Sequence, residues 1–225
     1  MRFRLVLASM AVLALAATGQ HLPFLQRKAS DFRSFGKITL FHLDQPLAAP
    51  APASLEAFPV KSFTYSLYPT AGSGQDGMIP GDTQTGAPLM IPVAGGMYDH
   101  RNDPNNPLEF EISRGDVVAL PKAPGGEAEL VYGALYSGPN LENCTGVVQV
   151  IELQAGKLLL TDQISYDCRG GAAPEWNGDK RQLTVRSARY SLGDKPCCPS
   201  QYDSVVFKLE GDKIKIGDVI INDQL

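Results

Sequence analysis

Four cysteines are the residues of this sequence with the most defined chemistry. They are Cys144, Cys168, Cys197 and Cys198. Residues 1–19 have the pattern of a signal peptide, and cysteines of an exported chain form disulfides by default. Four cysteines allow three pairings. Zinc is poorly supported, because no histidine neighbours them and an oxidising compartment favours disulfides over thiolate ligands. We therefore predict disulfides, with no bound metal and no cofactor.

The spacing of Cys144 and Cys168 fits a disulfide across a β-hairpin. Residues 146–153 and 158–166 have the pattern of two strands around a three-residue loop, Ala155-Gly156-Lys157. In that register Cys144 faces Cys168, at a separation that a disulfide can bridge. We therefore predict a Cys144–Cys168 bond.

The adjacent Cys197 and Cys198 leave several outcomes open. They can form a vicinal disulfide, stay reduced, or exchange with Cys144 and Cys168. In the last case each member of the hairpin pair would bond one member of the vicinal pair. A strained vicinal disulfide can be redox-active or can shape a ligand-binding turn. The interpretation that we favour is a locally cross-linked surface turn.

The histidines give no catalytic constellation. His21 and His42 precede the predicted globular domain, which leaves His100 beside Asp99. A catalytic triad needs a nucleophile, a base and an orienting acid, and the sequence contains no G-x-S-x-G or Cys–His pattern. We interpret His100 as a surface residue and assign no catalytic residue.

Oxygen-bearing side chains gather in one loop, where they could bind a hard cation. They are Asp99, Asn102, Asp103, Asn105 and Asn106. Their spacing differs from an EF-hand, and the prolines between them favour Asx turns, in which the side chains bond their own backbone. Paired carboxylates for glycoside hydrolysis are a further option, although most chains offer such pairs. The candidates are Glu127, Glu129, Glu142 and Asp167.

The elements that position these residues are predicted to be β-strands. Alternation puts Phe63, Tyr65 and Leu67 on one face of a strand, and the same period recurs from Leu108 to Ile112. Fuller apolar runs predict strands covered on both faces. They span 116–120, 146–153 and 158–160, and further strands follow at 183–185 and 205–209. The alternation of 213–216 predicts an edge strand guarded by lysines. The expected fold is mostly β, an antiparallel sandwich or roll with few or no helices.

The beginning of the chain has the pattern of a secretory signal peptide, residues 1–19. Arg2 and Arg4 precede an apolar run from Leu5 to Ala17, which is shorter than the roughly 20 residues that span a bilayer. We expect cleavage near this point, an exported location in the periplasm or outside the cell, and no stable membrane anchor afterwards.

Three segments are expected in the chain. Residues 1–19 form the signal peptide, residues 20–59 an N-terminal segment with a Pro/Ala-rich linker, and residues 60–225 a single β-rich domain. Residues 22–35 leave room for one short helix, and 72–88 has the composition of a long loop. The domain boundary at residue 60 rests on the linker assignment.

The charge of the chain argues against two classes of partner. Loss of Arg2 and Arg4 with the signal peptide, which contains no acidic residue, changes the formal net charge from -4 to -6. An acidic chain without a dense basic stripe is a poor ligand for nucleic acid or for an anionic membrane surface. We expect the partner to be an envelope protein or a glycan.

The cysteine-containing turn carries a resemblance to a known family. The run Asp194-Lys195-Pro196-Cys197-Cys198-Pro199-Ser200 resembles the gD-x-x-C-C-P-[ST] signature of uncharacterised bacterial exported proteins of the LppP/LprE type. Weaker matches at 63–68, 95–98 and 206–209 extend the resemblance to about residues 60–216. The lipobox cysteine is missing here, and the family's acidic loop appears without its aspartates at 120–127. The resemblance implies export and a β fold, and it implies no activity.

These observations favour a non-enzymatic envelope module that binds a protein or a glycan. Two alternatives belong to other classes. One is a hydrolase of an envelope polymer, which needs two carboxylates, or His100 and an acid, to converge in a cleft. The other is a redox-active protein that uses Cys197 and Cys198.

Overall fold

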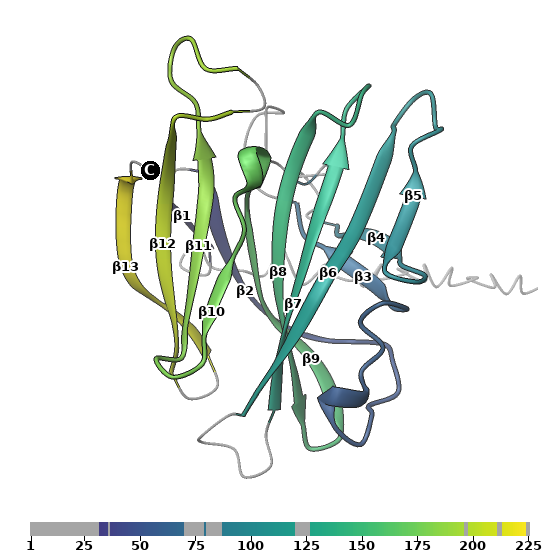
Figure 1. Ribbon diagram of the computed structural model, residues 1–225. Coiled ribbons are helices and arrows are strands. Elements are labelled where there is room, and N and C mark those ends of the chain that lie inside the picture. Colours follow the sequence, from purple (N-terminus) through teal and green to yellow (C-terminus); the bar gives the residue numbers. More distant parts are fainter. Residues whose placement is uncertain are drawn as a thin grey trace, which may run out of the picture.

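A computed structural model of the chain describes residues 32–35, 37–69, 79, 87–119, 127–195, 198–210 and 213–223. These residues form antiparallel β-sheets, with two short 3-10 turns as their only helical elements (Figure 1). The prediction of a mostly β sandwich is therefore confirmed. The predicted signal peptide, most of the 72–88 loop and Cys197 lie outside the described residues.

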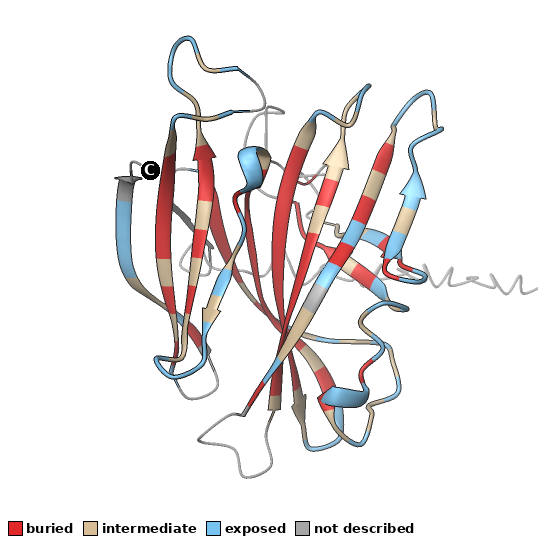
Figure 2. Cartoon of the chain, in the orientation of Figure 1, coloured by how far each residue is buried: buried red, intermediate tan, exposed pale blue. Residues whose placement is uncertain are grey.

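The largest layer is a seven-stranded sheet in the order β1-β2-β9-β8-β7-β6-β5. Its strands are β1 (Phe32–Phe35), β2 (Ile38–Pro46), β5 (Met97–His100), β6 (Leu108–Ala119), β7 (Glu127–Ser137), β8 (Asn143–Gln154) and β9 (Lys157–Asp167). Strands β8 and β9 lie at its centre and are buried along most of their length, as their continuous apolar runs predicted (Figure 2).

Strand β6 differs from that prediction at its end. We expected 116–120 to be covered on both faces, but Asp116 is half-buried and Val117 is 38% exposed. Only one face is covered here: Val118 lies in the core between the two larger sheets, whereas Val117 is on the opposite face of β6 and belongs to neither core within the described chain. Leu120 lies outside the described residues.

A second sheet of four strands packs on one face of the first. Its order is β10 (Glu175–Asn177), β11 (Gln182–Arg189), β12 (Gln201–Glu210) and β13 (Lys213–Asp223). Ile164 of β9, Val185 of β11 and Phe207 of β12 are almost fully buried in the core between the two sheets. Strand β13 is the edge strand that the alternation of 213–216 predicted, with Ile214 buried and Lys215 exposed.

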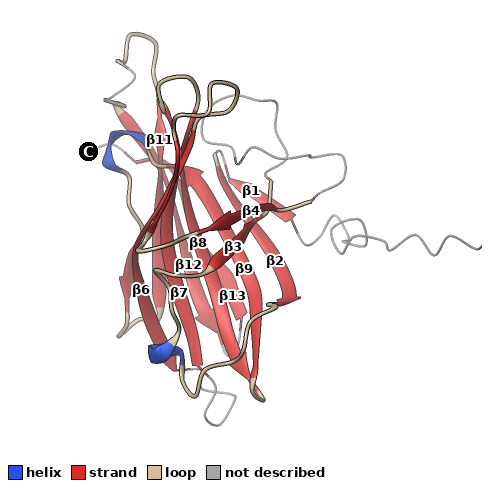
Figure 3. Ribbon diagram, turned by 90° about the vertical axis from the view of Figure 1, so that its right-hand side faces the viewer, coloured by secondary structure: helices blue, strands red, loops and turns tan. Residues whose placement is uncertain are grey.

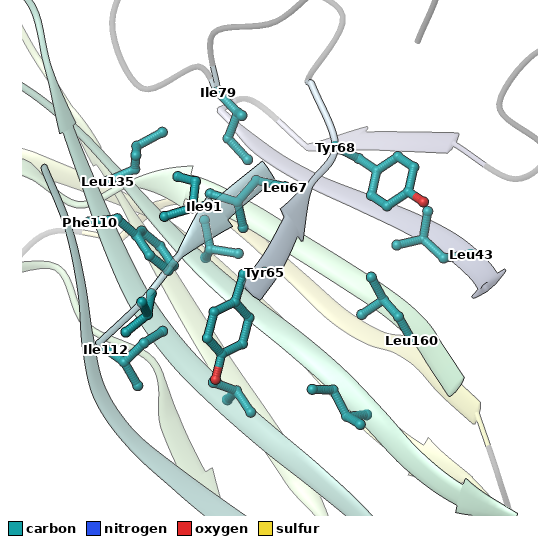
Figure 4. Close-up of a cluster of buried hydrophobic side chains, with 14 of the residues drawn as sticks. Leu43, Tyr65, Leu67, Tyr68, Ile79, Ile91, Phe110, Ile112, Leu135 and Leu160 are labelled. Carbon is teal, nitrogen blue, oxygen red and sulfur yellow. The ribbon is translucent and has the colours of Figure 1, made fainter. Parts of the chain in front are cut away.

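A third, smaller layer covers the other face of the large sheet. It consists of the pair β3 (Thr64–Leu67) and β4 (Leu89–Pro92), with the 3-10 turn η3 (Leu55–Ala57) near the lower end of the sheet (Figure 3). Tyr65 and Leu67 point into a second core against Phe110 of β6 (Figure 4). The predicted faces of the strands at 63–67 and 108–112 are thus confirmed.

Two buried glutamines fix the small layer on the sheet. The Gln163 side chain accepts a hydrogen bond from the Tyr68 amide at 3.0 Å and donates one to the Tyr68 carbonyl at 2.9 Å. Gln149 donates to the Ser66 carbonyl at 2.7 Å and to Gln163 Oε1 at 3.1 Å. Buried amides of this kind tolerate few alternative arrangements, because each misplaced partner leaves a polar group unpaired. The network therefore sets where β3 crosses the sheet.

The segment before residue 60 belongs to the fold, so the expected boundary between linker and domain is wrong. Strand β2 lies between β1 and β9 in the large sheet, and Leu55 and Phe58 are buried in the second core. The Pro/Ala-rich stretch follows the sheet surface, where the Leu47 amide donates to the Leu158 carbonyl at 3.0 Å. The Pro/Ala composition indicated neither the bends at Ala48 and Ala49 nor the packing of this stretch, in which Leu47, Ala49 and Ala51 are partly buried against the second core.

Candidate functional site

The Cys144–Cys168 disulfide is present, with its two Cα atoms 5.3 Å apart. The three-residue loop Ala155-Gly156-Lys157, from which we predicted this bond, was a wrong prediction. Ala155 and Gly156 both have positive φ, 48° and 71°, and form a two-residue turn that pairs Gln154 with Lys157. A β-bulge then adds one residue, Thr161, to β9, and this shift brings the cysteines back into line.

The described residues of the signature run, 194–195 and 198–200, lie between β11 and β12. Asp194 Oδ2 accepts hydrogen bonds from the Ser191 amide at 2.7 Å and from the Ser200 amide and hydroxyl at 2.9 Å each. The Cys198 amide donates to the Lys195 carbonyl at 2.9 Å. The amide bonds hold the pKa of Asp194 below its usual value. The Asp and the Ser of the motif therefore have a structural role, which is to close this loop.

The loop also packs beside the disulfide. The 3-10 turn η4 (Arg169–Gly171) follows Cys168, and a Cβ on Gly170 would lie 2.3 Å from Pro199 Cδ. Tyr202 donates from its hydroxyl to the Gly170 carbonyl at 2.9 Å. Cys198 is exposed and disulfide-bonded. Cys197 lies outside the described residues, so a vicinal bond stays a prediction.

A groove of about 450 Å³ lies between the Pro/Ala-rich segment and β3. Residues 46–50 form one wall, and residues 62–64 with Ser66, Met90 and Val93 form the other. This lining contains no charged side chain and combines apolar groups with three hydroxyls. Such a surface suits an uncharged ligand that offers both apolar contacts and hydrogen-bonding groups.

Aromatic packing and a side-chain hydrogen bond hold the walls of this groove in place. Phe63 packs against Phe58 and Tyr65, with ring centroids 4.9 and 5.2 Å apart. Met90 is 55% exposed, and its sulfur accepts a hydrogen bond from the Ser66 hydroxyl at 3.3 Å. Our sequence reasoning missed the groove because it placed one wall in a linker. The proline-rich composition beside the Phe63 strand was the only signal for it.

Three of the four candidate carboxylates are engaged within the chain. Glu127 accepts a hydrogen bond from the Leu55 amide at 2.8 Å, and Glu142 accepts one from the Asn140 amide at 2.8 Å. Asp167 is fully buried and bonds Lys37 at 3.0 Å and Arg169 at 2.6 Å. Burial opposes the ionisation of Asp167, but these bonds outweigh it and lower its pKa.

Glu129 is the exception among these carboxylates. It is 4% exposed, and its Oε2 atom has no hydrogen-bond partner within the described part of the chain. Its carboxylate lies over Gly115, where an added Cβ would come within 2.3 Å of Oε1. Burial, together with the negative charge of Asp116, raises the pKa of Glu129 to about 7. Glu129 is therefore a proton-binding group near neutral pH.

The oxygen-rich loop forms the Asx turns that we predicted. Asp103 Oδ1 accepts from the amides of Asn105 at 2.9 Å and Asn106 at 3.4 Å, and Asp99 Oδ1 accepts from the Arg101 amide at 3.1 Å. His100 is exposed, as expected of a surface residue, and it lies 3.3 Å from Asp103 Oδ2. These carboxylates serve the local backbone.

A histidine that we had placed outside the domain is paired with a buried acid. His42 of β2 lies opposite Asp162 of β9, with His42 Nδ1 2.5 Å from Asp162 Oδ1. The histidine side chain is 33% exposed and the aspartate 2% exposed. Burial raises the pKa of Asp162, against the opposing effect of the His42 hydrogen bond. No local pattern indicated this pair, because its members are 120 positions apart.

Comparison with known proteins adds no relative: no family model, curated protein or solved structure matches the chain. The resemblance to exported LppP/LprE-type proteins thus rests on the cysteine signature and its companion segments, and it stays a prediction. None of the helical elements in the described residues has the length and apolarity needed to cross a membrane.

Proposed function

We propose that this chain is an exported, non-enzymatic binding module of the cell envelope. In this proposal the groove between residues 46–50 and β3 takes an extended, uncharged segment of a partner protein. The observation that carries the proposal is the groove itself, formed by an uncharged lining on a rigid, three-layered β scaffold. The Cys144–Cys168 disulfide supports an oxidising location.

The chemistry of the lining favours a peptide over a glycan. Sugar rings present hydroxyls that call for several hydrogen-bonding groups, whereas the groove presents apolar groups such as Leu47, Phe63 and Met90. The three hydroxyls, from Ser62, Thr64 and Ser66, are few enough to match the backbone of an extended segment. A segment with small apolar side chains would bury the exposed part of Met90.

A selection experiment tests this proposal. The full secreted chain is used to select binders from a library of random linear peptides, and the same chain is screened against envelope glycans. We expect uncharged, apolar peptides to be enriched. Their binding should fall about tenfold or more in Met90→Lys, because a charge would then have to be desolvated in the groove.

Met97→Lys is the matched control, since Met97 is 40% exposed on β5 and does not line the groove. Binding should be unchanged in that variant. Peptides that bind Met90→Lys as well as wild type, or a glycan that binds while no peptide does, would contradict the proposal.

The His42–Asp162 pair supports a second candidate, a hydrolase of an envelope polymer. An imidazole oriented by a buried carboxylate is the base-and-acid half of a catalytic triad. In this case purified cell-wall polymer should release soluble fragments with wild type and not with His42→Gln. Equal release by both, or release by neither, would remove the candidate.

A further inference from the structure

Strand β13 forms a long open edge of the four-stranded sheet. Its 11 residues pair with β12 alone within the described part of the chain. The edge strands β1, β5 and β10 are much shorter, with four, four and three residues. Figure 1 shows β13 on the outer side of the sheet, away from β11. A long edge presents a row of backbone donors and acceptors to another strand.

The second half of this edge also exposes apolar side chains. Val219 is 40% exposed and Ile220 is 49% exposed. Val219 lies opposite the buried Val205 and so faces the core side of the sheet, while Ile220 faces the other side. Lysine protects the first half of the strand, where Lys215 is 61% exposed. An added strand would therefore cover apolar groups on both faces.

We propose that β13 pairs antiparallel with β13 of a second copy of this chain. The two four-stranded sheets then join into one continuous eight-stranded sheet around a two-fold axis. Such a contact is isologous, because each copy contributes the same strand. This interface is separate from the groove and does not depend on what the groove binds.

The register of this pair follows from a β-bulge and from charge. Between Val206 and Phe207 the pairing with β13 shifts by one residue, so the alternation of faces in β13 changes at Gly217. When Lys215 of one copy lies opposite Asp218 of the other, both side chains are on the outer face of the joined sheet. In the same register, the core-facing Ile214 of one copy lies opposite the core-facing Val219 of the other. This register forms two opposite-charge pairs by symmetry.

One competing register that also preserves the faces is displaced by two positions. It would place Lys215 opposite Ile220 and leave Asp218 opposite Gly217, so no charge pair forms across the axis. Opposite charges directly across two strands stabilise their pairing, and like charges destabilise it. Charge complementarity therefore selects the register with the two Lys215–Asp218 pairs. In the single chain, Lys215 instead bonds the exposed Glu210 at 3.1 Å.

Sedimentation equilibrium of the full secreted chain over a range of concentrations tests this proposal. We expect a concentration-dependent dimer. Lys215→Asp and Asp218→Lys should each weaken it by on the order of tenfold, because like charges then face each other twice. Mixing the two variants should restore association, since opposite charges then meet at both positions.

Asp179→Lys is the control for charge change, because Asp179 is exposed in the turn between β10 and β11. Its dimer should equal that of wild type, and circular dichroism should show all variants folded. A wild-type chain that stays monomeric at every concentration would overturn the proposal. So would a dimer that both single variants and their mixture leave unchanged.

Discussion

Cys144 and Cys168 join the two strands of the β8–β9 hairpin beyond the last described backbone pair, Thr145 with Asp167. Their sequence separation is 24, so the bond closes a loop of about 25 residues. By restricting the unfolded chain, such a loop stabilises the fold by roughly 3 kcal/mol. The double variant Cys144→Ser/Cys168→Ser should therefore show a clearly lower melting temperature in thermal denaturation.

Replacing the adjacent Cys197 and Cys198 by serine is the matched comparison. An adjacent pair closes almost no loop, so we expect a smaller loss of stability. Non-reducing peptide mapping gives a second, direct readout. A peptide that links Cys144 to Cys197 or Cys198 in the native chain would contradict this assignment.

Glu129 should make the stability of the fold depend on pH. Its pKa in the folded chain is about 7, above the ordinary value of 4.5, so folding favours the protonated form. The protonated Glu129 side chain makes its full contribution to the free energy of unfolding below about pH 4.5, and this contribution is lost as the pH rises through 7. For a pKa shift of this size, Glu129 changes the free energy of unfolding by about 3 kcal/mol between low and high pH.

Glu129→Gln removes this titration and should stabilise the chain at pH 8 relative to wild type, with little effect at pH 4. Urea denaturation at both pH values measures the effect. Glu142→Gln is the control, because Glu142 is exposed. Equal pH dependence in wild type and Glu129→Gln would show that Glu129 is ionised in the folded chain at no cost.

Among the elements, the β3–β4 layer depends on Gln163 for its position. Gln163→Met removes the two hydrogen bonds between its side chain and the Tyr68 backbone, which costs about 1–3 kcal/mol. Hydrogen exchange should accelerate first at 64–68 and 89–92, and only later in β8. Uniform acceleration across all sheets would instead indicate that β3 is not held separately.

The β8–β9 hairpin shows what local pattern can and cannot predict. Continuous apolar runs predicted both strands, because a strand buried on both faces needs them. The turn was wrong by one residue, and the bulge at Thr161 offset that error before the cysteines were reached. The disulfide prediction was therefore correct although part of its geometry was not. Bulges depend on packing across the sheet, which a short window of sequence does not contain.

The Pro/Ala-rich segment shows the same limit over a longer distance. Its composition predicted a linker, but residues 46–50 form a wall of the groove, with bends at Ala48 and Ala49. That it lies on β9 and faces β3 depends on contacts with residues far along the chain, such as Leu158. The same distance hid the His42–Asp162 pair. Sequence alone therefore predicted β3, β6, β8, β9 and β11 to β13, but not strands such as β2 and β7, the groove or the pair.

For the whole molecule, export predicts a defined start of the mature chain. Arg2 and Arg4 followed by the apolar run predict cleavage between Ala17 and Gln20. Intact-mass measurement of secreted material should give a chain that begins in this interval. Recovery of the full-length chain in the cytoplasm would contradict export and with it the proposed envelope role.

The molecule keeps its three notable surfaces apart. The groove lies over the outer face of the large sheet, the Asp194 loop joins β11 and β12, and β13 is the edge of the second sheet. A ligand of the groove should therefore leave the other two surfaces unperturbed. Because the surfaces are separate, a result that contradicts the proposal for one surface does not bear on the other surfaces.

The most direct measurement of the central proposal is a map of the bound peptide on the labelled chain. Nuclear magnetic resonance shifts of backbone amides, recorded during titration with a selected peptide, would provide it. We predict changes confined to residues 47–49, 62–66 and 90–93, and their loss in Met90→Lys. Changes centred on residues 191–200 or on β13, with the groove unaffected, would contradict the proposal that the groove is the binding site.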